Sequence, residues 1–299
     1  MERARLSFVV FFLLYLVAKN HAADSTVEAY WKMKLGNTPM PKAIKANVQH
    51  GTKIINGSTV LQEAITVNIY KCGSTEERVI NDDTITSLFF SEKDLSVGQN
   101  MNLHFPKSLG ESAFVPRHVV ESIPFSSGKL DQILALFGVK KESPAAGTIK
   151  ETIERCQMNE TMKNENYCAT SLESMIDYVA ANLGNKVTAL SSVIPKDTSM
   201  QSYSVLEVKK LGDERSAISC HRSSYPYTVF ICHKRPSTVP YMVSLVGKDG
   251  MMIEAAAVCH EDTSEWSPEF VAFQVLKVGP GSPVCHFIYQ YNVLWVRGN

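Results

Sequence analysis

Residues 220–233 read CHRSSYPYTVFICH, with a Cys-His dipeptide at each end. Two further dipeptides follow, Cys259-His260 and Cys285-His286, so that 10, 25 and 24 residues separate successive pairs. The four pairs hold four of the seven cysteines and half of the eight histidines. Random placement would not produce that concentration, which indicates one framework in the C-terminal part of the chain.

A Cys-His step has a definite meaning in an extended strand, because neighbouring side chains there point to opposite faces. The sulfur goes to one face and the imidazole to the other, so four steps predict a disulfide layer and a histidine cluster together. Four cysteines permit three pairings, and the sequence does not choose among them. The residues concerned are Cys220, His221, Cys232, His233, Cys259, His260, Cys285 and His286.

The other cysteines also indicate an oxidising compartment. Cys156 and Cys168, with eleven residues between them, predict a local bridge. Seven is an odd number, and Cys72 stands far from the others, so we expect Cys72 to be the unpaired thiol.

The N-terminus has the layout of a secretory signal peptide. Arg3 and Arg5 precede a 12-residue apolar run over residues 6–17, and the small residues Ala22-Ala23 follow. The run is too short for a membrane span, and no later segment is long and apolar enough for one. We predict a signal peptide over residues 1–23 and entry into the secretory pathway; an N-terminal anchor is the alternative.

Two acceptor triplets for N-glycosylation agree with export, at Asn56 and Asn159. Lys plus Arg and Asp plus Glu number 30 each, and 44% of the residues are hydrophobic. That composition excludes a disordered chain, and without a basic excess it gives no sign of a nucleic-acid partner.

The chain divides into a leader or linker over residues 24–87 and one main domain over residues 88–297. In the leader, Tyr30-Trp31 begins a helix-like patch that two prolines, Pro39 and Pro41, should end. The domain begins with helical patterns, of which the clearest has Ser171 as its cap and Gly184 as its stop. We expect helices at 116–120, 126–137, 145–155 and 171–183.

After Gly184 the periodicity changes to that of strands, separated by turns such as Lys248-Asp249-Gly250. Helices followed by strands predict an α+β fold, with an antiparallel β-rich domain that disulfides staple. We expect strands at 187–194, 203–208, 225–233, 241–246, 253–260, 270–278 and 284–296.

Further blocks accompany the four Cys-His pairs between Leu88 and Val296. They are Phe89-Phe90 with Asp94-Leu95 and Gly98, residues 123–127 (IPFSS), residues 167–175 (YCATSLESM), Tyr225-Pro226-Tyr227, Asp262-Thr263-Ser264 before Trp266, Phe287 and Trp295. With these motifs the chain resembles a plant BURP-domain protein. The short leader without repeats is similar to the seed and embryo members, such as the unknown seed proteins, and unlike the polygalacturonase β-subunit type.

The resemblance implies a site. Some BURP proteins look like copper-dependent peptide cyclases that crosslink a tyrosine or tryptophan side chain. By this resemblance, the candidate copper ligands are His221, His233, His260 and His286. Imidazole is a common protein ligand for copper and zinc. The alternative is that the cysteines form two bridges and the histidines only hydrogen-bond beneath them.

Three observations argue against catalysis, and the residues leave open whether the protein is an enzyme. No core peptide with a crosslinkable aromatic residue is present. Phe270 stands where a family histidine is usual, and Tyr291-Asn292 where an Asp-His pair is often found. No other catalytic motif occurs, neither a phosphate loop nor a nucleophile elbow.

Three functions therefore follow as expectations from the resemblance. The first is a non-catalytic role in the apoplast, cell wall or protein storage vacuole, during seed development or stress. The second is a copper-dependent cyclase acting on a peptide substrate. The third is a wall-binding module that contacts cell-wall polysaccharide and escorts a polysaccharide-degrading enzyme.

Overall fold

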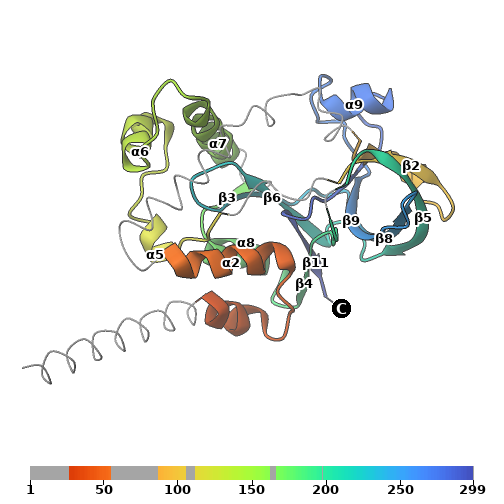
Figure 1. Ribbon diagram of the computed structural model, residues 1–299, viewed down its shortest axis with the longest axis horizontal. Coiled ribbons are helices and arrows are strands. Elements are labelled where there is room, and N and C mark those ends of the chain that lie inside the picture. Colours follow the sequence, from red (N-terminus) through yellow and green to blue (C-terminus); the bar gives the residue numbers. More distant parts are fainter. Residues whose placement is uncertain (1–26, 55–86, 106–111, 162–165, 197, 299) are drawn as a thin grey trace, which may run out of the picture.

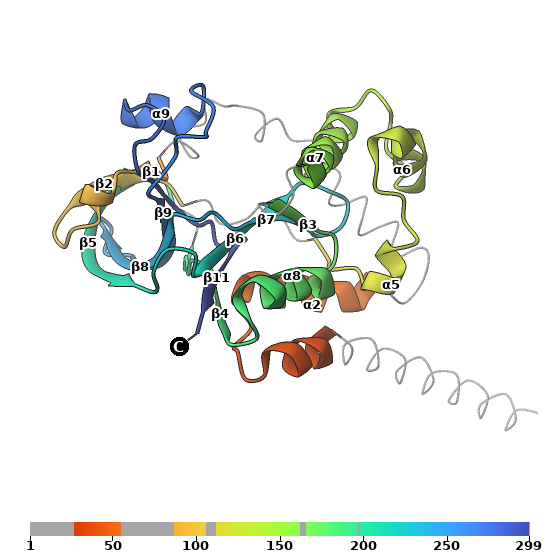
Figure 2. The ribbon, with the colours of Figure 1, turned by 180° about the vertical axis from the view of Figure 1, so that it is seen from behind.

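The structure is a computed structural model that describes residues 27–54, 87–105, 112–161, 166–196 and 198–298. Two antiparallel sheets lie side by side, and helices gather on one of them (Figure 1). Figure 2 shows the same division from behind, with the curled six-stranded sheet and α9 at one end and α5, α6 and α7 at the opposite end. The predicted α+β class with antiparallel strands and disulfides is confirmed.

Each sheet draws its strands from distant parts of the sequence. The six-stranded sheet has the order β1 (Phe89–Phe90), β10 (Val284–Phe287), β9 (Met252–His260), β8 (Thr238–Gly247), β5 (Gln201–Lys210), β2 (Asn100–Leu103). The five-stranded sheet has the order β3 (Asn166–Ala169), β7 (Val229–His233), β6 (Ala217–Ser223), β11 (Val293–Arg297), β4 (Val187–Leu190).

The helices are mostly short. They are residues 27–35, α2 (Lys42–Ile54), η2 (Glu92–Asp94), α5 (Arg117–Val120), η3 (Ser127–Lys129), α6 (Leu130–Leu136), α7 (Pro144–Thr161), α8 (Leu172–Leu183) and α9 (Val271–Leu276). The predicted ends of α8 are confirmed. The Ser171 hydroxyl accepts a hydrogen bond from the Ser174 backbone N–H at its start, and Gly184 has a φ of 84° at its end. A positive φ costs little in glycine, which explains the stop.

The leader helices belong to the core of the five-stranded sheet. Trp31 and Trp295 are both buried, and their ring centroids lie 5.4 Å apart. Helix 27–35 and α2 pack there beside α8. The Trp31 indole N–H donates to the Thr38 carbonyl oxygen, and the Thr38 hydroxyl donates to the Val187 carbonyl oxygen of β4. Residues 27–48 are therefore part of the folded unit.

Asp177 of α8 is a second attachment point for the leader. Its carboxylate accepts a hydrogen bond of 2.5 Å from the Tyr30 hydroxyl and one of 2.6 Å from the Arg117 guanidinium. Lys34 adds an ion pair at 3.3 Å. Burial alone would raise the pKa of Asp177, but the hydrogen bonds from these three groups outweigh it and lower the pKa below its usual value.

The two sheets meet through an apolar layer. Ala217 and Leu294 from the five-stranded sheet pack there with Ala256 and Val258 from β9. Ile288, which follows β10, belongs to the same layer, and its backbone N–H donates to the Ala256 carbonyl oxygen of β9 at 2.7 Å. Strand alternation places the histidines of β6 and β9 on the same faces as this layer. The layer therefore continues directly into the histidine positions.

Two predicted strands are corrected by the structure. The segment 270–278 contains the helix α9, which buries Ala272 and Phe273 against Val284 of β10. Its aromatic and β-branched residues favoured a strand, but tertiary packing overrides that weak preference. The segment 284–296 is two strands, β10 and β11, and each of them belongs to a different sheet.

Several predictions fall on residues that the structure leaves undescribed. The signal peptide over residues 1–23, the glycosylation acceptor Asn56 and the unpaired Cys72 lie outside the described residues. Asn159 lies within α7, and its glycosylation stays a prediction. Within the described ranges, no helix combines the length and apolar character that crossing a membrane requires.

Replacing Trp31 with alanine should lower the free energy of unfolding by about 3–5 kcal/mol, because a large buried side chain is lost. Urea denaturation followed by circular dichroism measures the change. The matched control is Met33→Ala on the same helix, where 68% of the side chain is exposed, and it should change little. Equal effects of the two variants would contradict the integration of the leader into the core.

The Asp177→Asn variant should destabilise the protein in a pH-dependent way. The folded-state pKa of Asp177 is lowered, so its contribution is present above the unfolded pKa near about 4 and disappears as pH falls through the folded value. At pH 6 we expect a loss of about 0.5–1 kcal/mol, because the carboxylate is partly exposed.

Urea titrations of both proteins between pH 6 and pH 2.5 measure that difference in stability. It should shrink towards zero at the acidic end of the series. Asp131→Asn, which breaks an exposed ion pair with Lys141 far from the leader, is the control. A constant difference at every pH would show that the Asp177 carboxylate contributes nothing as a charge.

Candidate functional site

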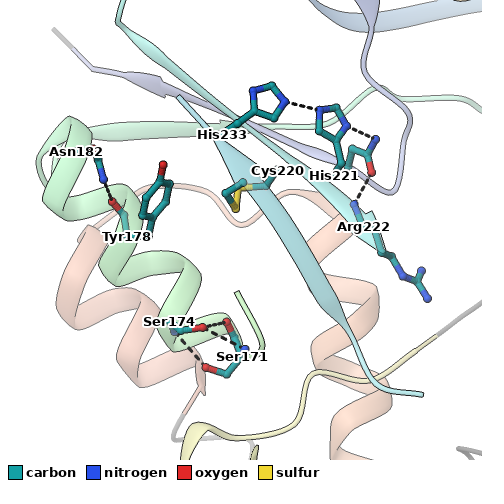
Figure 3. The surroundings of a disulfide bond; sticks show 10 residues. Ser171, Ser174, Tyr178, Asn182, Cys220, His221, Arg222 and His233 are labelled. Carbon is teal, nitrogen blue, oxygen red and sulfur yellow. Dashed lines mark hydrogen bonds between the residues drawn. A yellow bond between two sulfur atoms is a disulfide. The ribbon is translucent and has the colours of Figure 1, made fainter. Parts of the chain in front are cut away.

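The first half of the site is the pair of strands β6 and β7. Cys220 lies directly opposite Cys232 in the register, and the two form a disulfide that is fully buried among the helices. His221 and His233 follow on the opposite face, and their Nε2 atoms lie 3.0 Å apart. Figure 3 shows the two imidazoles on one side of the strands and the sulfur of Cys220 on the side of α8.

The second half repeats this arrangement in the other sheet. Cys259 of β9 lies opposite Cys285 of β10, and their disulfide is buried in the core of the six-stranded sheet. His260 and His286 emerge on the other face, with their Nε2 atoms 3.4 Å apart. The third disulfide, Cys156–Cys168, ties α7 to β3.

The two histidine pairs face each other across the junction of the sheets. The ring centroids of His221 and His286 are 5.8 Å apart, and those of His233 and His260 are 6.0 Å apart. The four imidazoles therefore form one closed cluster, which we call the histidine cluster. His260 is buried, and the other three are half-buried.

The histidine cluster is electrically neutral near pH 7. Burial is the main cause, and it lowers the pKa of all four imidazoles. For His233 the pKa falls to about 4, where the neighbouring His286 adds to the effect of burial. A neutral imidazole keeps one nitrogen lone pair, which is the form that ligates a metal ion.

Three of the four rings have a defined partner at Nδ1. The Nδ1 atom of His221 lies 3.1 Å from Asn292 Nδ2, and that of His260 lies 3.0 Å from the Thr238 hydroxyl oxygen. The Nδ1 atom of His286 lies 3.2 Å from the Phe287 carbonyl oxygen. These contacts hold the Nε2 atoms inwards, and groups in this position commonly orient the histidines of metal sites.

Aromatic side chains cover one side of the histidine cluster. Trp266 lies edge-on to His260 with the ring centroids 5.0 Å apart, and Phe89 lies edge-on to His286 at 6.0 Å. Phe270 contacts both Trp266 and Phe89. Phe270, where the family resemblance led us to expect a histidine, therefore contributes to an apolar wall around these imidazoles.

Copper, which the family resemblance implies, can be tested against these donors. Two nitrogens that each lie about 2.0 Å from one tetrahedral ion are about 3.3 Å apart. The separations of 3.0 and 3.4 Å within the two pairs match that value. In the described part of the chain no group of three or more His, Cys, Asp or Glu side chains is arranged to hold one ion. The spacings within the two pairs thus fit copper.

The sequence pattern led to the four histidines but missed two of their partners. Thr238 starts β8, and a lone threonine carries no signal of a contact with His260. Asn292 stands in the loop after β10, at a position already marked as a departure from the family pattern. β10 and β11 belong to different sheets, so the loop between them passes from one sheet to the other. This passage brings Asn292 to His221.

The fold and the site define a class of protein. Its domain has two antiparallel sheets, each with a cross-strand disulfide, and the Cys-His dipeptides place four imidazoles between the sheets. The BURP domain family model matches residues 88–297. The chain therefore belongs to the plant BURP-domain family, a conclusion that its relatives support.

Three curated relatives show the extent of the similarity. BURP domain-containing protein 5 of Oryza sativa subsp. japonica is 39% identical over 93% of this chain and 89% of its own length. BURP domain-containing protein 2 of the same organism is 37% identical over 95% of this chain and 97% of its own length. BURP domain protein RD22 of Arabidopsis thaliana is 44% identical over 74% of this chain, but only 58% of that protein is covered.

Replacing both Cys259 and Cys285 with alanine should lower the free energy of unfolding by about 3–4 kcal/mol, because the bridge closes a long loop. It should also separate the His260–His286 pair, since the bridge sets the register of their strands. Urea denaturation and the ring-proton chemical shifts of the histidines measure the two effects.

Cys156→Ala combined with Cys168→Ala is the control for that experiment, because this bridge joins α7 to β3 and does not connect the strands that carry His260 and His286. It should lower stability and leave the shifts of His260 and His286 unchanged. Histidine shifts that respond equally to the loss of either bridge would contradict the local role of Cys259–Cys285.

Proposed function

We propose that this BURP-domain protein enters the secretory pathway and binds copper at the histidine cluster, with a structural, non-catalytic role. The place of that role is the cell wall, the apoplast or the protein storage vacuole, during seed development or stress. The observation that carries the copper proposal is the close approach of two pairs of neutral imidazole Nε2 atoms at one junction.

Donor chemistry supports copper over harder cations. The cluster offers nitrogen donors, and the cysteines near it are all occupied in disulfides. Imidazole nitrogens suit copper and zinc, whereas magnesium and calcium favour oxygen. Among the divalent ions of the first row, copper binds such a set most strongly.

The non-catalytic part of the proposal has support in the leader. The candidate aromatic substrates there are Tyr30 and Trp31, and both side chains are engaged in packing or hydrogen bonding. Trp31 is 3% exposed and packs on Trp295, while the Tyr30 hydroxyl donates to Asp177. Neither ring is presented to the histidine cluster for crosslinking. Copper therefore has a structural use in this proposal.

Metal analysis tests the proposal. Purified full-length protein, dialysed against buffered Cu²⁺ and then against buffer, should retain about one copper ion per chain. His286→Ala should reduce the retained copper by at least about tenfold, because one donor of a close pair is lost. His118→Ala is the matched control, since its exposed imidazole lies outside the cluster. Retention below about a tenth of an equivalent would refute copper binding.

The same sample distinguishes a structural role of copper from the catalytic alternative. Intact-mass spectrometry after incubation with Cu²⁺ and oxygen should show an unchanged mass if the copper is structural. A loss of two hydrogens, located by fragmentation at a tyrosine or tryptophan, would instead show oxidative crosslinking and refute the non-catalytic role. Retention on isolated cell walls or pectin, with serum albumin as the control, tests the proposed location.

A further inference from the structure

Asn292 is a buried amide whose orientation is fixed by its neighbours. It is 3% exposed, and its Oδ1 atom accepts a hydrogen bond of 2.9 Å from the backbone N–H of Arg222. A backbone N–H can only donate, so the amide oxygen must be the atom that faces it. The Nδ2 group therefore points to His221.

This orientation decides which nitrogen of His221 carries the proton. The Asn292 Nδ2 group has only hydrogens to offer, so the Nδ1 atom of His221, 3.1 Å away, must accept. In a neutral imidazole the proton is then on Nε2. That proton points to the Nε2 atom of His233 at 3.0 Å, which accepts it. His221 is thus a donor within its pair and has no Nε2 lone pair for a metal ion.

The partners of the second pair impose different states. His286 places Nδ1 against the Phe287 carbonyl oxygen, which can only accept, so its proton is on Nδ1 and its Nε2 lone pair is free. His260 places Nδ1 against the Thr238 hydroxyl, which can either donate or accept. His286 is therefore preset as a ligand, and His260 can adopt either tautomer. Among the described residues, Asn292 is the side-chain partner that leaves its histidine, His221, without a lone pair on Nε2.

We propose that Asn292 is a positioning residue that holds His221 in the Nε2–H tautomer and so keeps it out of the ligand set. The pair whose Nε2 atoms can ligate is then His260 and His286, 3.4 Å apart, and His221 remains a hydrogen-bond donor to His233. The ligand assignment rests on the proposed copper binding. The tautomer of His221 does not, because it is a property of the metal-free protein.

The tautomer is read directly in the metal-free protein. Long-range proton–nitrogen NMR of histidine-labelled protein at pH 8, assigned with His221→Ala, should show the proton of His221 on Nε2. Asn292→Asp keeps the size of the side chain but replaces the donor with a carboxylate oxygen, so it should move that proton to Nδ1. Asn102→Asp, which adds the same charge at an exposed position of β2, should leave it on Nε2.

Either of two NMR results would overturn the proposal: a proton on Nδ1 in the wild-type protein, or a proton that stays on Nε2 in Asn292→Asp. Thermal melting monitored by circular dichroism shows that each variant is folded. Should Asn292→Asp not fold, the wild-type spectrum alone decides the tautomer.

Copper titration against a competing chelator tests the ligand set. In the wild-type background, His221→Ala should weaken copper binding by less than about threefold, and His286→Ala by about 10–100-fold. In the Asn292→Asp background, His221→Ala should weaken it by about 10-fold or more, because His221 can then ligate. Equal losses for His221→Ala and His286→Ala in the wild type would overturn the assignment.

Failure of the proposed function gives a different result. If no variant binds copper, the proposed copper site is refuted, and the NMR measurement still decides whether Asn292 fixes the tautomer of His221.

Discussion

The alternation of side chains at the four Cys-His dipeptides determines both where the disulfides lie and where the imidazoles gather. Each pair of strands places two cysteines directly opposite one another, so that the disulfide forms inside the core of its own sheet. The adjoining imidazoles are then forced to the other face, where the second sheet lies. The bridges fix the register of their strands, and a one-residue slip would turn every imidazole into the core. Covalent stapling and the histidine cluster are two results of one pattern.

The packing around the histidine cluster explains its electrostatic state. Apolar residues such as Val258 join the sheets on one side, and Trp266 and Phe89 cover the rings on another. Taking a charge out of water is costly, so these surroundings keep the imidazoles neutral. The Nε2 atoms of the four neutral imidazoles meet in pairs, and three of the Nδ1 atoms have partners outside the cluster. The same lone pairs that make these bonds are the ones that a metal ion would use.

Much of this architecture could be predicted from the sequence, because the strongest signals were local. Ser171 and Gly184 marked the ends of α8, and strand alternation at the Cys-His steps predicted a histidine cluster of the kind that the structure assembles. The failures were not local. The apolar run at 270–278 has strand-like composition and becomes α9 only because Ala272 and Phe273 meet Val284. Nothing near Asn292 in the sequence reveals its contact with His221, which arises only when the chain crosses between sheets.

The burial of Trp31 against Trp295 has a consequence for how this family is handled at the bench. The matched family region begins at residue 88, yet helix 27–35 and α2 supply part of the core of the five-stranded sheet. An expression clone trimmed to that region would leave an apolar surface around Trp295 exposed to solvent. Such faces drive association in water, so clone design should begin ahead of Val27.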